Sequence, residues 1–219
     1  MEFCASPFWD VNLTWYNANP DFTPCFHDTA LVYVPAAFLW LTAALEVTKC
    51  RNSADRGVPW TALTITRLGL VGALVLLSLA DLLLELVYGF SSPSAVLAPI
   101  VSALTYSLSL TLSRASMVCG RPASAVQFGF YTLSVAAATF TFTSVVRFPG
   151  TVWRADQFVV AVMHYATLVA AYFLHFWADD PPTYIDVSRK LSERPSLPSF
   201  VSVILPPDLQ SKRRKRAHT

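Results

Sequence analysis

The chain has 219 residues, of which 54% are hydrophobic and only 14% are charged, and its mean hydropathy is +0.46. Soluble globular domains carry about 25% charged residues, so this composition excludes an ordinary soluble domain and indicates that lipid surrounds much of the chain. The net charge of +2 is small, but the basic residues are unevenly placed: none precedes Lys49, and five of the sixteen lie in Lys212–Arg216.

Five segments are long and apolar enough to cross a membrane, since a spanning helix needs roughly 20 mostly apolar residues. Their apolar residues are continuous rather than alternating, which favours helices over the strands of a membrane barrel. The sequence therefore predicts an all-α membrane protein, a bundle of five transmembrane helices joined by short loops. The predicted spans are 30–48, 61–88, 95–112, 125–146 and 158–177.

The basic residues also predict the orientation of the bundle, because they gather on the cytoplasmic side of membrane proteins. With the N-terminus outside, the outer segments hold only Arg147 and Arg154, and the inner segments and tail hold the other 14. We therefore expect an extracellular or lumenal segment over 1–29, the bundle over 30–177, and a C-terminal cytoplasmic tail over 178–219. The tail is rich in Ser, Pro and charge, so we expect it to be mostly disordered.

The polybasic end of the tail, Lys212–Arg216, has two interpretations: contact with anionic lipid headgroups, or simple solvation. A nuclear-import signal does not suit a chain with five spans, and we expect the lipid bilayer and no nucleic acid as a partner. The protein should be a multi-pass protein of the plasma membrane or of an endomembrane or vacuolar compartment.

The predicted outer segment contains a glycosylation sequon and two cysteines. Asn12 begins the sequence Asn-Leu-Thr, an acceptor for N-linked glycans in a segment that faces the lumen during synthesis. Cys4 and Cys25 lie in the same oxidising compartment, which favours a disulfide between them over two free thiols. Cys50 and Cys119 fall in predicted inner loops, where we expect them to remain reactive thiols.

Asp81, Glu85 and His164 are ionisable residues that lie inside predicted spans. Asp81 and Glu85 are four residues apart and therefore share one face of the second helix, in its outer half, and His164 lies in the fifth. Intramembrane ionisable residues are costly and mark a polar partner, a wet cavity or a substrate path. Either hydrogen bonding between helices or a role in transport is compatible with the sequence.

Two further features concern helix packing. Glu46 and Arg67 are expected at similar cytoplasmic depth on helices that are consecutive in the chain, so an interhelical ion pair is a candidate. Gly69 and Ala73 form a small-xxx-small step, which lets helices approach closely.

Several kinds of chemistry lack their motifs. The sequence has no Gly-Lys dipeptide, and hence no phosphate-binding loop of the form G-x-x-x-x-G-K-[ST]. It also has no G-x-S-x-G, C-x-x-C or H-E-x-x-H. We expect no catalytic residues, no metal, no ATP or other cofactor, and no enzymatic activity.

The outer segment resembles the N-terminus of the multidrug resistance-associated, or C, subfamily of ABC transporters. The resemblance is carried by Phe8-Trp9-Asp10, Asn12, Thr14-Trp15, Asn19-Pro20-Asp21-Phe22-Thr23 and Cys25-Phe26. Shorter similarities lie in the second and third predicted spans, at Ala80-Asp81-Leu82 and Leu97-Ala98-Pro99. In that subfamily an extra five-helix domain precedes the transport core. The glycosylated Asn and paired outer cysteines of the family correspond to Asn12, Cys4 and Cys25.

The resemblance implies an accessory transmembrane domain that serves partner contact, trafficking and membrane retention, with the transport core of an ABC exporter or another membrane protein as its partner. Family members continue into two transport domains and two nucleotide-binding domains, whereas this chain leaves the pattern near 199–204. We therefore expect a truncated product, splice form or gene-model fragment, and ATP-driven export of drugs or organic-anion conjugates only in a full-length relative. The alternative is a self-contained small transporter or channel that uses Asp81, Glu85 and His164.

Overall fold

The computed structural model describes residues 3–4, 6–16, 20–51, 62–89, 92–119, 124–147 and 155–176. Within these ranges every regular element is a helix. Two short helices, α1 (Val11–Trp15) and α2 (Pro24–Asp28), precede α3 (Ala30–Arg51), α4 (Ala62–Tyr88), α5 (Pro93–Val118), α6 (Ala125–Arg147) and α7 (Ala155–Phe176). The last five are long and apolar enough to cross a membrane, which confirms the predicted all-α architecture. The predicted tail, 178–219, lies outside the described residues.

Local sequence explains where the helices begin and end. α5 starts at Pro93 because a proline suits the first helical position, and the Ser92 hydroxyl accepts a hydrogen bond from the Ala95 N–H at 3.4 Å. α4 ends before Gly89, whose positive φ of 85° is a conformation that only glycine adopts without strain. α5 continues beyond its predicted end at 112. Its serine hydroxyls there find acceptors within their own helix, as Ser113 does at the Ser109 carbonyl at 2.9 Å.

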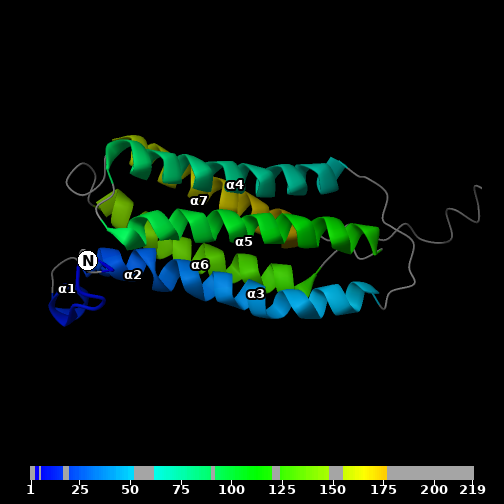
Figure 1. The fold of residues 1–219 in the computed structure, drawn as a ribbon, viewed down its shortest axis with the longest axis horizontal. Coiled ribbons are helices and arrows are strands. Elements are labelled where there is room, and N and C mark those ends of the chain that lie inside the picture. Colours follow the sequence, from blue (N-terminus) through cyan, green and yellow to red (C-terminus); the bar gives the residue numbers. More distant parts are fainter. Residues whose placement is uncertain are drawn as a thin grey trace, which may run out of the picture. The chain divides into compact units, whose positions relative to one another are not determined.

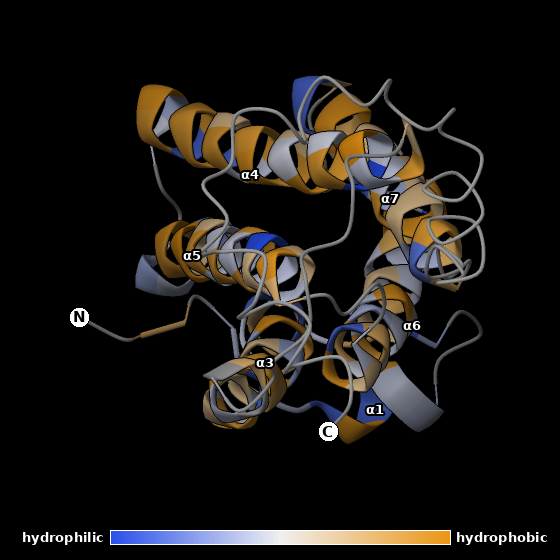
Figure 2. Ribbon diagram, turned by 90° about the vertical axis from the view of Figure 1, so that its right-hand side faces the viewer, coloured by the Kyte–Doolittle hydropathy of each residue, from blue (hydrophilic) through white to orange (hydrophobic). Residues whose placement is uncertain are grey.

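The five long helices form a closed ring (Figures 1 and 2), in which α5 packs against α4 and α3, α6 packs against α3 and α7, and α7 returns to α4. α3 and α4 follow one another in the chain, yet α5 lies between them in the ring. We call the end of the ring where α3 begins the cap end, because α1 and α2 lie there (Figure 1).

Large side chains fill the ring away from the cap end. Leu39, Leu74, Tyr131 and Leu168 come from four different helices, and each is completely buried. Polar side chains connect the helices in the same region: the Ser109 and Tyr131 hydroxyls lie 2.9 Å apart, and the Gln127 amide donates to the Ser113 hydroxyl at 2.8 Å. This half of the bundle is therefore a packed core.

Candidate functional site: a cavity inside the helix ring

The segment that carries the family resemblance folds into an aromatic cluster at the cap end. Phe22 stacks on Phe26 with ring centroids 4.8 Å apart, and Phe8 and Trp9 each approach Phe26 to 5.5 Å. Phe22 also contacts Phe140 of α6 at 5.6 Å, which attaches the cluster to the ring. Packing thus explains Phe8, Trp9, Phe22 and Phe26 of this segment, whereas Trp15 is 71% exposed.

A polar network joins the same segment to α6. Asp21 accepts a hydrogen bond from the Ser144 hydroxyl at 2.6 Å and lies 3.4 Å from the His27 ring. The other nitrogen of the buried His27 ring is 3.3 Å from the Thr141 hydroxyl. Sequence reasoning missed this network, because its cap residues and its α6 residues are more than 110 residues apart in the chain. The only signal in the sequence was that Asp21 and His27 lie within an aromatic-rich motif.

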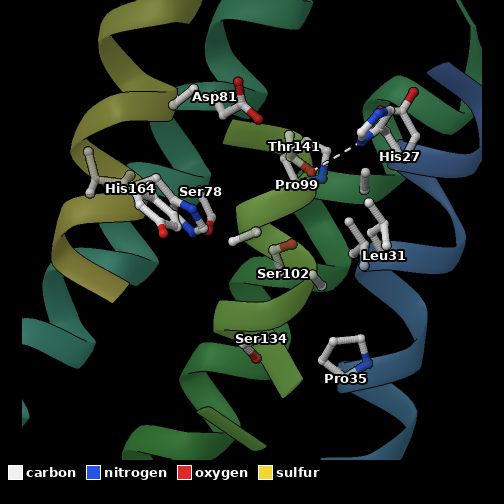
Figure 3. A pocket seen from close by; sticks show the side chains of 18 of the residues that line it. His27, Leu31, Pro35, Ser78, Asp81, Pro99, Ser102, Ser134, Thr141 and His164 are labelled. Carbon is white, nitrogen blue, oxygen red and sulfur yellow. Dashed lines mark hydrogen bonds between the residues drawn. The ribbon is translucent and has the colours of Figure 1, made fainter. Parts of the chain in front are cut away.

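Below this cap, the ring encloses a cavity of about 220 Å³ (Figure 3). All five long helices contribute to its wall, mainly through the half nearest the cap end, and α6 also contributes Phe130 and Ser134 from its other half. In Figure 3, Asp81, Ser78 and His164 lie on one side of the open space, and His27, Leu31 and Pro35 lie across from them. The other polar residues of the wall are Asp28, Glu85, Ser102, Thr105, Tyr106, Ser134, Thr141, Gln157 and Tyr165.

The structure brings Asp81, Glu85 and His164 to this one cavity. Glu85 accepts a hydrogen bond from the Gln157 amide of α7 at 2.6 Å, and His164 packs against the Tyr106 ring at 5.6 Å. Asp28, at the end of α2, is a third carboxylate on the wall and lies 3.5 Å from the Ser94 hydroxyl. Sequence reasoning missed Asp28 because it lies before the predicted span.

The cavity is closed at its inner end. Tyr106 and Phe130 meet there with ring centroids 6.1 Å apart, and the buried Tyr131 lies directly behind Phe130 at 5.0 Å. In the described residues the space is therefore a blind cavity and not a pore through the bundle.

The proposed pairing of Glu46 with Arg67 assumed that α3 and α4 are adjacent, and this assumption was wrong. Because α5 separates these helices, Arg67 turns instead toward α7 and donates to the Leu174 carbonyl at 2.8 Å. Glu46 lies in a small groove between α3 and α5, beside Cys50 and Leu112. The prediction took helices that are consecutive in the chain to be neighbours in the bundle, but the order of the helices around the ring differs from their order in the chain.

The four cysteines form two pairs at opposite ends of the ring. Cys4 and Cys25 form a disulfide in the cap with Cα atoms 5.6 Å apart. Cys50 and Cys119 are also paired, with a Cα separation of 5.5 Å, so the expectation of two independent thiols in loops was wrong. Cys50 is still within α3, and Cys119 directly follows α5, its ring neighbour. Because each end of the ring has a cysteine pair, the cysteines do not distinguish the outer end from the inner end. The predicted orientation therefore rests on the basic residues alone.

Asn12 is exposed in α1, where its backbone N–H bonds to the Asp10 carboxylate at 2.9 Å. A glycan at this side chain would extend into solvent. Among the described residues, no three His, Cys, Asp or Glu side chains are grouped as a metal site would require.

A ring of five apolar helices with an ordered N-terminal cap defines a multi-pass membrane domain. The sequence model of the ABC transporter TMD0 domain family matches residues 3–159, and the chain belongs to this family. The domain is an accessory transmembrane region of C-subfamily ABC exporters and not their catalytic ATPase domain.

Similar proteins agree with this assignment. ATP-binding cassette sub-family C member 3 from Homo sapiens is 28% identical over 187 residues, which cover 82% of this chain and 12% of the relative. Member 3 from Mus musculus is 29% identical over 190 residues, with the same coverage of both chains. Member 2 from Rattus norvegicus is 29% identical over 150 residues, which cover 67% of this chain and 10% of the relative. The chain thus spans about a tenth of the length of these relatives.

Proposed function

We propose that the chain serves as an accessory domain that contacts the transport core of a C-subfamily ABC exporter, assists its trafficking and retains it in the plasma membrane or an endomembrane or vacuolar membrane. The observation that carries this proposal is the family match over residues 3–159. ATP-driven export of drugs or organic-anion conjugates belongs to a full-length relative. Because the sequence lacks a Gly-Lys phosphate loop, we expect neither ATP binding nor catalysis by this chain.

The outward face of α4 supports contact with a partner helix. Gly69 and Gly72 lie on this face, and a Cβ atom added at either would have no neighbour within 4 Å. The exposed side chains Ile65, Leu76 and Leu83 continue the same stripe, with exposures of 57%, 68% and 60%. Small residues between large apolar ones let a second helix approach closely. The glycines are not needed for packing within the ring, and this leaves them available to a partner.

The test is co-expression of the tagged chain with the transport core of a C-subfamily exporter that lacks its own accessory domain. We expect the core to co-purify with the chain and to increase at the cell surface. The Gly69→Leu variant should weaken both effects, because the new side chain fills the notch in α4. Ala136→Leu, at an exposed position of α6, is the matched control and should leave both co-purification and the surface level of the core unchanged. Absence of both effects with the unmodified chain would refute the proposal.

A self-contained transporter or channel is the alternative, and one observation favours it: Asp81, Glu85 and His164 share one cavity. The closed inner end argues against an open pore, so transport would require the helices to move. Purified chain in liposomes should show no uptake of inorganic or organic ions above empty liposomes. Saturable uptake that Asp81→Asn abolishes would replace the accessory-domain proposal with this alternative.

A further inference from the structure

We propose that the cavity inside the ring is a binding site for a small protonated amine, with the ammonium group at Asp81 and Glu85 and an apolar body toward Tyr106 and Phe130. This site is distinct from the outward face of α4. It could be occupied whether or not a transport core is bound.

The charge of the wall favours a cation. Asp28, Asp81 and Glu85 all face the cavity, and among the described residues no lysine or arginine lines it. Of the two histidines on the wall, His27 is already engaged by Asp21 and Thr141. A carboxylate away from bulk water is costly unless a charge or a hydrogen-bond donor compensates it. A cationic ligand would supply both.

Two polar groups that face the cavity have unused hydrogen-bonding capacity. Within the described part of the chain, Asp81 receives no hydrogen bond, and the nitrogens of His164 have no hydrogen-bond partner although the ring packs on Tyr106. Glu85 has a donor in Gln157, at 2.6 Å, which fixes its orientation. An N–H donor at Asp81 would form a charge-assisted hydrogen bond, which is stronger than a neutral one.

Two helix prolines leave carbonyl groups of wall residues without their usual helical donor. Pro35 and Pro99 lie inside α3 and α5, and a proline has no N–H to give to the carbonyl four residues earlier. Those carbonyls belong to Leu31 and Ala95, and both residues also line the cavity. With its carboxylates and hydroxyl groups, the wall offers many acceptors, and an ammonium group carries donors only.

The size and the apolar wall favour an organic cation over a metal ion. About 220 Å³ is the volume of about seven waters at ~30 Å³ each, much more than a single ion needs. The carboxylates in the described residues are not grouped for metal coordination. The aromatic rings of Tyr106, Phe142 and Tyr165 line the space, and such rings attract cations and pack against apolar groups.

The test measures binding of 2-phenylethylammonium to the purified full chain in nanodiscs, with 2-phenylethanol as the neutral probe of similar shape. We expect saturable binding of the amine, and binding of the alcohol weaker by about tenfold or more, because a charge-assisted hydrogen bond is lost. Asp81→Asn keeps the shape of the side chain and should weaken amine binding to a similar extent. Glu46→Gln, which removes a carboxylate outside the cavity, should leave amine binding unchanged.

A second variant separates binding from folding. Ala161→Leu adds volume to the cavity wall without changing charge and should reduce binding of both probes, while far-UV circular dichroism and elution volume stay unchanged. Equal binding of amine and alcohol, equal binding of the amine to the unmodified chain and the Asp81→Asn variant, or no saturable binding of the amine would each overturn the proposal.

Discussion

The hydroxyl group of Ser144, near the end of α6, lies 2.6 Å from a carboxylate oxygen of Asp21, which is 123 residues earlier in the chain. This contact connects the cap to the ring, together with the Arg147 guanidinium, which donates to the Pro20 carbonyl at 3.1 Å. The N-terminal segment is therefore held by the same helix end that borders the cavity.

Removal of the Ser144 hydroxyl should loosen the cap without unfolding the ring. We expect Ser144→Ala to cost ~1–2 kcal/mol locally, because the Asp21 carboxylate loses a donor. Hydrogen exchange should accelerate at the amides of 20–28 and stay unchanged in α4. Thr143→Ala is the control, since the Thr143 hydroxyl bonds only to the Phe140 carbonyl of its own helix. Equal exchange in both variants would contradict the connecting role of Ser144.

The hydrogen bonds of Gln127 should hold α5 and α6 together at the end opposite the cap. Its amide donates to the Ser113 hydroxyl at 2.8 Å and to the Ser109 carbonyl at 3.1 Å. Gln127→Leu should lower the free energy of unfolding by about 0.6–2 kcal/mol, the range measured for polar contacts between membrane helices. Unfolding in mixed micelles would measure this. Thr132→Val, at an exposed site on α6, should change the free energy of unfolding less. A larger loss for Thr132→Val than for Gln127→Leu would contradict the role of Gln127.

The glycines of the bundle should respond differently to the same substitution. Alanine normally stabilises a helix over glycine by about 1 kcal/mol, and at Gly69 the new Cβ meets nothing within 4 Å. At Gly129 it would lie 3.1 Å from the Phe38 ring, so the ring would have to shift. We expect Gly69→Ala to have a higher midpoint of thermal unfolding than Gly129→Ala. Equal midpoints would show that α3 and α6 pack less closely than described.

Cys50 and Cys119 should be isolated as an intramolecular disulfide. Their Cα separation of 5.5 Å falls within the range of disulfides, about 4.4–6.8 Å. Chain alkylated without a reductant should therefore carry no label at Cys50 or Cys119, and reduction before alkylation should expose both thiols to the label. Labelling of both cysteines without reduction would contradict the pairing.

The orientation and the use of Asn12 can be tested together. If the N-terminus is outside, Asn12 should carry a glycan, and Asn12→Gln should lose the mass that glycosidase treatment removes from the unmodified chain. Asn52→Gln, in a segment predicted to be inside, is the control and should leave the mass of the glycan unchanged. Cysteine reporters near residue 152 should react in intact cells, whereas reporters near residue 55 should not. The opposite labelling pattern would invert the bundle.

The sequence by itself determined the number and type of the spans and the family. A membrane-spanning helix can be recognised from the sequence because it needs a continuous apolar segment. The family motif can be recognised in the same way, because its residues are close together in the chain. The sequence also placed Asp81 and Glu85 on one face, because a four-residue step returns to the same side of a helix.

Only the tertiary structure decided which helices are neighbours. The order of the ring turns Arg67 toward α7 instead of α3, pairs Cys50 with Cys119, and places Asp28 beside a cavity that Asp81 and His164 also line. These relationships depend on how five similar apolar helices pack. Lipid does not distinguish one apolar face from another, so the packing order is set by shape and by a few polar contacts between distant residues.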